Sequence, residues 1–259
     1  YCRYSQQRGL ACTYRLRAFN FNKKVGNLED FMERFSMSFE GMIVLDADSL
    51  MSGKSMVMLC QLLQDNPSVG LLQLQPMPVR QTTMFGRCYQ FSACTFCELF
   101  ATGYAYWWLD SSSFIGHNAI IRIEPFRRHC SLPMLPLGGP LGGHVLSHDH
   151  VEAALLRKAG WAVWMIPFGE GSYEEIPTNL IDHLAREFRW LVGELQHVQL
   201  VTQPGLDALA RFQLFSGVLA YLANPLWLYT WVVAAHEMAQ FEWGIIEPLA
   251  VGEEVEAER

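Results

Sequence analysis

The sequence has few charged residues and no long basic stripe. Asp, Glu, Lys and Arg make up only 17% of the 259 residues, and the net charge is -7 at pH 7. The most basic stretches, residues 15–24 and 122–128, are short and more typical of a solvated face than of a phosphate-binding surface. Nucleic acid is therefore excluded as the main partner, whereas a hydrophobic share of 51% is ample for a folded core.

The sequence also lacks a paired set of cysteines. Its seven cysteines are odd in number and scattered, which excludes a disulfide framework and fits a reducing compartment. Cys94 and Cys97 form a single C-x-x-C in an aromatic segment, and no second pair stands at the spacing that a zinc site needs. We expect both to be small packing residues, and a metal or redox role is the alternative.

One stretch lacks formal charge altogether. Residues 212–235 are long enough to cross a bilayer core of roughly 30 Å. Asn224-Pro225 interrupts this stretch, so we expect an interfacial helix followed by a short span, and a buried hairpin of a soluble core is the alternative. The aromatic residues that suit an interfacial belt are Trp227, Tyr229 and Trp231.

Apolar runs and helical patterns alternate in the first part of the chain. Residues 27–39 predict a helix capped by Asn27, and the run "GMIVLDAD" at 41–48 predicts a buried parallel strand. A helix at 54–67 and a second strand at 69–76 follow. This order predicts a right-handed crossover in an α/β sheet, in which ligands bind beyond the carboxyl ends of the strands.

The same patterns extend through the rest of the chain. We find no internal repeat and no low-complexity tract. The predicted elements are a helix at 82–102, a strand at 118–126, a Pro- and Gly-rich loop at 132–144, a helix at 147–161 with Ser147 as its N-cap, a strand at 161–167 and an amphipathic helix at 176–200.

Asp46 and Asp48 follow the first apolar run and aim at one small volume. Carboxylates in this D-x-D spacing are hard oxygen ligands for Mg²⁺ or Mn²⁺, which bind substrate phosphates in turn. Alone, the pair is more often solvated or a cap for the next helix.

Asp149 lies in the first turn of the helix predicted at 147–161, between two histidines. A carboxylate there suits a general base, and a capping acid is the alternative. A zinc site is a further alternative, although adjacent positions on one helix converge poorly on a tetrahedral ion. Its ligands are His144, His148, Asp149 and His150.

Arg186, Arg189 and Trp190 share one face of the last predicted amphipathic helix. Guanidinium groups can hold a diphosphate, and Trp can form the wall of a sugar tunnel. A helix with two Arg and one Trp is, on its own, more often an ordinary packed face.

Together and in this order, the motifs resemble the processive, membrane-attached family-two glycosyltransferases with the GT-A fold. The closest resemblance is to the subfamily that builds the β-glucan backbone of osmoregulated periplasmic glucans from UDP-glucose at the bacterial inner membrane. It covers residues 24–231. The phrases that carry it are "KVGNLEDF", "VLDADSLMSG", "GHNAIIR", "GGHVLSHDHVEAALLRKAGW", "EGSYEEIPTNLIDHL" and "RFQLFSGVLAYLANPLWL".

The resemblance implies a role for each motif. Asp149 is the general base of an inverting transfer, and Asp46 and Asp48 hold Mg²⁺ or Mn²⁺ on the donor diphosphate. The other implied roles are UDP contacts for Lys24, Gly26 and Asn27, acceptor contacts for Gly116, His117 and Asn118, and the family's Q-x-x-R-W position for Arg186, Arg189 and Trp190. The implied partners are UDP-glucose, a β-glucan acceptor and membrane lipid, with the catalytic part in the cytoplasm.

The chain departs from the subfamily at several positions. Ile115 stands where the subfamily phrase has Trp, "WWLDSSSF" replaces a glycine-rich stretch, and "WLVGELQH" stands for "WCQGNLQH". The chain begins with Tyr1 and has no signal peptide, so we expect a piece of a longer protein. The uridine-binding strand expected before Lys24 is missing, as are the transmembrane helices expected after Ala235.

The sequence therefore predicts a partial GT-A domain, inactive in one interpretation. The expected division is an unrecognised segment at 1–23, the glycosyltransferase domain at 24–205, an interfacial or transmembrane segment at 206–236 and an acidic tail at 237–259. Three alternatives remain: a non-catalytic binding or assembly module, a family-two synthase of another polymer such as cellulose or chitin, and a metal-dependent hydrolase.

Overall fold

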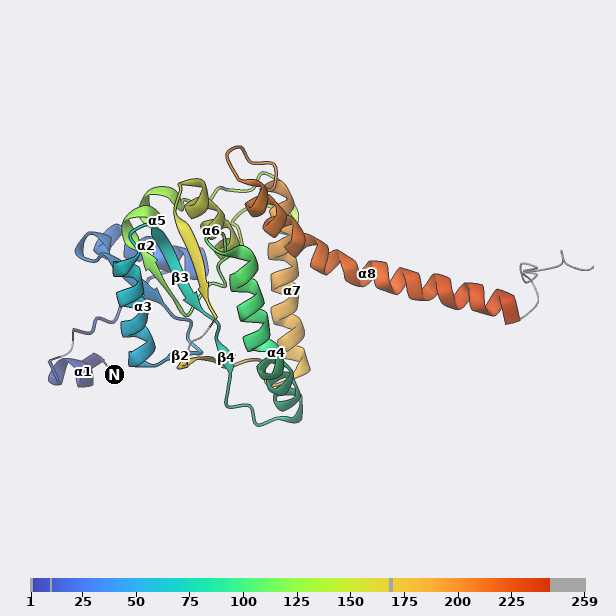
Figure 1. Cartoon of the computed structure of the whole chain (residues 1–259), viewed down its shortest axis with the longest axis horizontal. Coiled ribbons are helices and arrows are strands. Elements are labelled where there is room, and N and C mark those ends of the chain that lie inside the picture. The colour runs from blue at the N-terminus through green and yellow to red at the C-terminus, as the bar shows by residue number, and fades with distance from the viewer. Residues whose placement is uncertain (1, 10, 168–169, 243–259) are drawn as a thin grey trace, which may run out of the picture.

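The computed structural model of the protein describes residues 2–9, 11–167 and 170–242. A four-stranded sheet forms its centre, in the order β1-β5-β3-β6, beside a smaller sheet in the order β2-β7-β4 (Figure 1). The central strands are β1 (Gly41–Val44), β5 (Ala119–Arg122), β3 (Val69–Leu74) and β6 (Ala162–Ile166). The smaller sheet contains β2 (Ser49–Met51), β7 (Ser172–Glu174) and β4 (Met77–Pro78). The α/β class predicted from the sequence is thereby confirmed.

Helices cover both faces of the central sheet. On one face, Leu59 and Leu63 of α3 pack against Leu72 and Ile120. On the other face, helices α2, α5 and α6 pack on the alternate strand residues, such as Leu71. The helices are α1 (Cys2–Gln7), α2 (Lys23–Phe35), α3 (Gly53–Asp65), α4 (Met84–Trp108), α5 (Ile123–His129), α6 (His148–Lys158), α7 (Leu180–Gln196) and α8 (Ala208–Glu242), with short 3₁₀ turns η1 (Ser36–Ser38), η2 (Gly139–Leu141) and η3 (His197–Gln199).

The central sheet is mixed, which corrects the prediction of a parallel β1. β5 lies between β1 and β3 and is antiparallel to both, so β1 and β3 run in the same direction without touching. β6 pairs with β3 in parallel. The apolar run alone did not reveal this, because a strand buried on both faces reads the same beside a parallel or an antiparallel neighbour.

Two predicted elements have different ends in the structure. The first helix begins at Lys23 and not after Asn27, so Asn27 lies inside α2 and the capping position belongs to Asn22. The strand predicted at 118–126 ends at Arg122, and α5 follows at once. Pro125 is compatible with α5 because it stands in the first turn, where a backbone N–H has no helical partner.

Three other helices lie where the sequence predicts them, with changed ends. α4 continues to Trp108, whose ring packs against Phe212 of α8. α7 begins at Leu180, where the Asn179 side chain caps the N–H of Asp182. Ser147 holds the N-cap position of α6, as predicted, but its side chain makes no capping hydrogen bond in the described structure.

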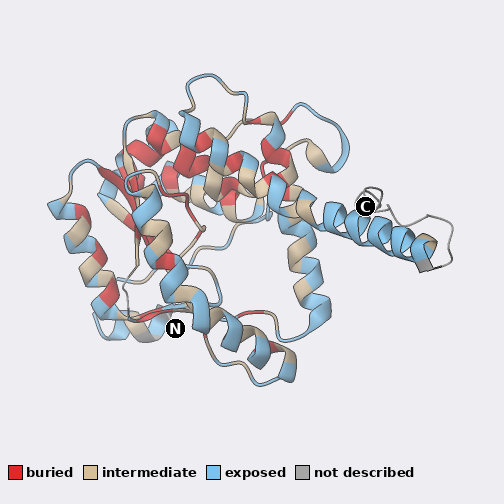
Figure 2. Ribbon diagram, turned by 45° about the vertical axis from the view of Figure 1, so that its right-hand side comes forward, coloured by how far each residue is buried: buried red, intermediate tan, exposed pale blue. Residues whose placement is uncertain are grey.

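α8 is one continuous helix of 35 residues that projects from the body of the molecule (Figure 1). Pro225 lies inside it, so the break expected at Asn224-Pro225 is wrong. Only 6% of an apolar 18-residue stretch of α8 is buried, which contradicts the buried-hairpin alternative. Figure 2 shows the projecting part of the helix as exposed. By length and composition α8 could cross a membrane. It extends into the acidic tail predicted at 237–259, of which residues 243–259 lie outside the described structure.

Before α2, the described residues form only α1 and an extended segment, with no strand. Arg15 and Arg17 attach this segment to α2. Arg15 donates to the carbonyl of Asn27 at 2.9 Å, and Arg17 donates to the carbonyl of Lys23 at 2.7 Å. These contacts fix the start of α2, which carries the first predicted site residues.

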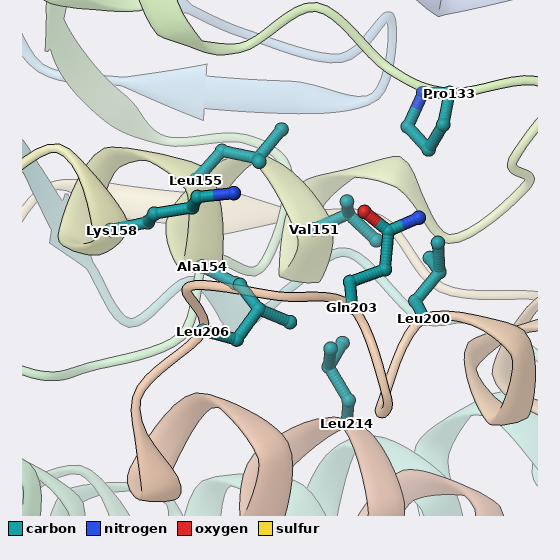
Figure 3. Close-up of a pocket in the computed structure, with 9 residues that line it drawn as sticks. All are labelled: Pro133, Val151, Ala154, Leu155, Lys158, Leu200, Gln203, Leu206 and Leu214. Carbon is teal, nitrogen blue, oxygen red and sulfur yellow. The ribbon is translucent and has the colours of Figure 1, made fainter.

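A small apolar cavity lies between α6, the η3 turn and α8. Its volume is about 20 Å³, which is room for a single water molecule and far too little for a sugar. Figure 3 shows the side chains of Val151 and Leu214 on opposite sides of it. This cavity is therefore separate from the predicted site residues Asp46 and Asp48, which follow β1.

Candidate functional site

Asp46 and Asp48 lie in the turn between β1 and β2, just beyond the carboxyl end of β1. The Ser49 hydroxyl accepts a hydrogen bond from the Asp46 backbone N–H at 3.1 Å, which tightens this turn. The Asp46 side chain is about one-third exposed and Asp48 is exposed. Both carboxylates are therefore accessible from solvent, as a binding role requires.

Lys24 joins three of the predicted motifs. Its ammonium forms an ion pair with the Asp46 carboxylate and donates to the carbonyl of Gly116 at 2.8 Å. Gly26 and Asn27 lie further from this point. A side chain at Gly26 would collide with the carbonyl of Phe21, and the Asn27 side chain accepts from Arg15. Of the K-x-G-N motif, the structure brings only Lys24 to the acids.

Asp149 approaches the same place from the start of α6. Gly116 has φ +97°, and a Cβ built on it would lie 2.8 Å from Asp149 Oδ2, closer than real Cβ contacts. Only glycine fits here, because its backbone is left-handed and the carboxylate takes the space of a side chain. Gly116 therefore lies between Lys24, which donates to its carbonyl, and Asp149, which faces the place of its missing side chain.

His117 and Asn118 connect the two sheets. His117 Nδ1 lies 3.1 Å from the Ser49 hydroxyl, and its Nε2 lies 3.4 Å from Glu174 Oε2. The buried Asn118 amide donates to the Ser172 hydroxyl at 2.8 Å. Asn118 is therefore occupied within the fold, whereas His117 faces the acids.

Glu174 is a member of this site that the sequence analysis did not single out. Burial raises the pKa of its carboxyl, His117 and Arg186 oppose that shift, and the charges of Asp48 and Asp46 reinforce it. Its only sequence signal is its place in the phrase "EGSYEEIP", where it resembles any polar loop residue. We call Lys24, Asp46, Asp48, His117 and Glu174 the donor-side cluster.

Arg186 and Trp190 form a stacked pair on α7. The Arg186 guanidinium lies 4.4 Å from the Trp190 ring centroid and 3.3 Å from the Tyr89 hydroxyl of α4. Trp190 remains 42% exposed, enough for its ring to contact a ligand. Arg189 is exposed, and the structure does not bring it into the donor-side cluster.

The four residues of the zinc alternative do not converge. His144 packs edge-on against Phe21, and His148 lies 3.0 Å from Glu152 Oε1 in the interior. His150 turns toward α7. Within the described residues, no group of three or more His, Cys, Asp or Glu side chains is placed to hold a metal ion.

Asp46 and Asp48 nevertheless fit one class of metal. Their carboxylate oxygens are the ligands of hard divalent cations, and the Lys24 ammonium beside Asp46 shows that positive charge is stabilised there. Two protein carboxylates suit an ion that takes its remaining ligands from water and a substrate phosphate.

Cys94 and Cys97 lie part-buried on α4 and face β4. Cys94 Sγ is 3.6 Å from the carbonyl of Pro78, and Cys97 Sγ is 3.2 Å from Met77 Sδ. Both side chains therefore pack against the smaller sheet, in agreement with a packing role.

Comparison with known proteins places the chain in a family. The sequence profile described as "Glycosyl transferase family group 2" matches residues 41–245. The chain belongs to this family. Three of its relatives are each named "Glucans biosynthesis glucosyltransferase H": one from Caulobacter vibrioides strain NA1000 / CB15N, 43% identical over 88% of this chain, one from Xylella fastidiosa, 46% identical over 83%, and one from Ralstonia nicotianae, 44% identical over 89%.

These relatives confirm the resemblance drawn from the sequence, at both the family and the subfamily level. The chain covers 34% of the Caulobacter and Xylella proteins and 27% of the Ralstonia protein. It thus spans about a third or less of the length of the relatives it matches.

Proposed function

We propose that the chain is the catalytic part of an inverting glucosyltransferase that transfers glucose from UDP-glucose to a growing β-glucan of the osmoregulated periplasmic type. One observation carries this proposal. Lys24, Asp46, Gly116 and Asp149, from four separate motifs, meet at the carboxyl end of β1 through an ion pair, a hydrogen bond and a close contact. The family and the names of the relatives support the reaction class.

Asp149 is the general base in this proposal. Its carboxylate takes the proton of an acceptor hydroxyl as that oxygen attacks the anomeric carbon of glucose, and the bond from that carbon to UDP breaks with its electron pair on the leaving diphosphate. The closeness of Gly116 supports this role, because it places the Asp149 carboxylate beside the residue whose carbonyl accepts from Lys24.

The donor lies along the donor-side cluster. Lys24 contacts the UDP, while Gly26 and Asn27 hold α2, the helix that carries Lys24, in place. Asp46 and Asp48 hold Mg²⁺ or Mn²⁺, which when bound neutralises charge on the diphosphate. Arg186 adds positive charge from α7, a role that its effect on Glu174 supports, whereas Arg189 of the same motif lies outside this cluster.

The acceptor glucan approaches over Gly116 and His117, and the buried Asn118 holds this turn through its hydrogen bond to Ser172. Trp190 supplies an exposed ring on which a sugar can stack, and the Arg186 guanidinium packs on that ring. The chain is associated with the bacterial inner membrane through α8 and lipid, with the catalytic part on the cytoplasmic side. The length and exposure of α8 support the association with a membrane.

The proposal is tested by measuring glucose incorporation into glucan with the full chain in inner-membrane lipid vesicles, supplied with labelled UDP-glucose and Mg²⁺ or Mn²⁺. We expect β-linked product from UDP-glucose and none from UDP-N-acetylglucosamine. Product from the latter sugar would favour a synthase of another polymer. A folded chain that binds UDP but transfers no sugar would contradict the proposed activity.

A further inference from the structure

A second polar cluster joins the first turn of α6 to α7, with Glu194 of α7 at its centre. Glu194 Oε1 is 3.3 Å from His150 Nε2, and Glu194 Oε2 is 3.1 Å from His197 Nδ1. The His150 Nδ1 lies 2.6 Å from the Ser113 hydroxyl. We call Glu194, His150, His197 and Ser113 the Glu194 cluster.

The Glu194 cluster ties the start of α6 to two other helices. His197 donates through Nε2 to the carbonyl of Ser147 at 3.0 Å, one residue before α6 begins. Gly193 of α7 faces the Ser147 side chain so closely that a Cβ would collide with it. Gly217 of α8 packs equally closely on the Glu194 carboxylate. Ser147 and His150, two residues before Asp149 and one after it, are thus held by α7 and the η3 turn, and α8 covers α7 at this point.

In the Glu194 cluster, the carboxylate of Glu194 faces the imidazoles of His150 and His197. Burial alone would disfavour the charged imidazole, but Asp149 and Glu194 outweigh it and raise the pKa of His150 to about 9. Burial would raise the pKa of Glu194, but hydrogen bonds from His150 and His197 hold that pKa well below its usual range. Tyr221 of α8 also lies within electrostatic reach of Glu194.

We propose that Glu194 is a positioning residue for the transfer reaction: by holding His150 against Ser113, it fixes the first turn of α6 with the Asp149 carboxylate facing Gly116. This inference rests on the proposed function for its kinetic consequences only. The mechanism requires Asp149 to meet the acceptor hydroxyl in one orientation, and a displacement of about 1 Å is enough to cost a large factor in rate.

The test compares the full-length wild-type chain with Glu194→Gln, which keeps the side-chain size and removes the charge. We expect kcat for glucose transfer to fall by about 10-fold while KM for UDP-glucose changes by less than about 2-fold, because the donor-side cluster is untouched. We also expect the alkaline limb of the kcat profile to move down by about 1 pH unit or more, because His150 loses its carboxylate partner.

A matched control is Asp207→Asn, which removes the 3.0 Å ion pair between Asp207 and Arg157. That pair also joins α6 to the residue just before α8, but at the far end of α6 from Asp149. We expect this variant to keep the wild-type kcat and alkaline limb. Equal losses of kcat in both variants, or a wild-type kcat and pH profile in Glu194→Gln, would overturn the positioning role.

Two readouts without activity separate this inference from the proposed function. The His150 imidazole, assigned in NMR spectra with His150→Gln, titrates near pH 9 in the wild type and at least about 1 unit lower in Glu194→Gln. Amide hydrogen exchange at residues 147–151 accelerates in Glu194→Gln and not in Asp207→Asn. A wild-type chain without transferase activity would sink the proposed function, whereas unchanged titration and exchange would sink the positioning role.

Discussion

The donor-side cluster and the Glu194 cluster both adjoin the Asp149 turn and differ in charge balance. The donor-side cluster has three carboxylates against the single fixed positive charge of Lys24, and it is partly exposed. In the Glu194 cluster, one carboxylate faces two imidazoles, and the His197 side chain is fully buried. An accessible site with excess negative charge is suited to a cation and its ligand, whereas a buried, matched site is suited to holding a backbone in place.

The Asp149 carboxylate, the proposed base, is placed in two different ways. On the donor side, Gly116 admits the Asp149 carboxylate because it has no side chain. In the Glu194 cluster, polar contacts from α7 fix the same turn of α6. The position of the Asp149 carboxylate therefore depends on the space left by Gly116 and on the charge network around Glu194. Substitutions can remove each of these independently.

The largest expected effect comes from Asp149→Asn. Removing the base lowers glucose transfer by about 1,000-fold, because proton removal from the acceptor is lost while donor binding remains. Kinetics of glucose incorporation together with UDP titration check this, and Asp182→Asn, an exposed acid in the first turn of α7, serves as the control. A parallel loss of UDP binding in Asp149→Asn would contradict the separation between base and donor site.

Gly116→Ala tests the space beside Asp149. The added methyl meets Asp149 Oδ2 and must adopt a φ of +97°, so we expect a loss of about 1–2 kcal/mol in the free energy of unfolding and about 10-fold in transfer rate. Gly103→Ala on α4 is the control, since a Cβ there meets nothing within 4 Å. Chemical denaturation and the transfer assay measure both losses, and equal behaviour of the two variants would refute the contact.

The pH dependence of stability tests the Glu194 cluster. The folded-state pKa of His150 is raised from 6.5 to about 9, so its stabilisation is fully present below 6.5 and is lost as the pH rises through about 9. We expect Glu194→Gln to lower the free energy of unfolding by about 1–2 kcal/mol near pH 6, a value reduced by solvent screening because the His150 side chain is 35% exposed.

Near pH 10 the same comparison should give almost no difference between wild type and Glu194→Gln, because His150 is then neutral in both. Denaturant titrations at the two pH values measure this change. A destabilisation that is equal at both pH values would show that the contact is one of packing and not of charge.

The smallest expected effect is at the surface. The ion pair between Glu124 and Arg128 of α5 joins two side chains that are both more than half exposed, so Glu124→Gln should change the free energy of unfolding by less than about 0.5 kcal/mol. This variant measures how much stability is lost when an exposed ion pair loses one partner. A loss as large as that of Glu194→Gln would remove the distinction between buried and exposed pairs.

Local patterns in the sequence predicted much of the fold. The apolar run before Asp46, the helix after it and the acid in the first turn of α6 follow from neighbours in the chain. The antiparallel insertion of β5 between β1 and β3 did not follow, because strand order depends on contacts between distant segments. Pro225 suggested a break in α8, yet the helix continues through it.

The candidate site was predicted in part. Lys24, Asp46, Gly116 and Asp149 come from motifs that carry a family pattern, and the structure brings them together. Glu174 and Glu194 were missed, since their role depends on partners far away in sequence. Glu194 is visible beforehand only as a departure in "WLVGELQH" from the subfamily phrase.

The central claim is that the acids ending β1 hold a divalent cation together with the donor diphosphate. Isothermal titration of UDP into the purified full chain, with and without Mn²⁺, tests it most directly beside an Asp46→Ala, Asp48→Ala double variant. The account predicts UDP binding that requires Mn²⁺ and vanishes in the folded double variant. Equal binding with and without Mn²⁺, or no binding by the folded wild-type chain, would contradict it.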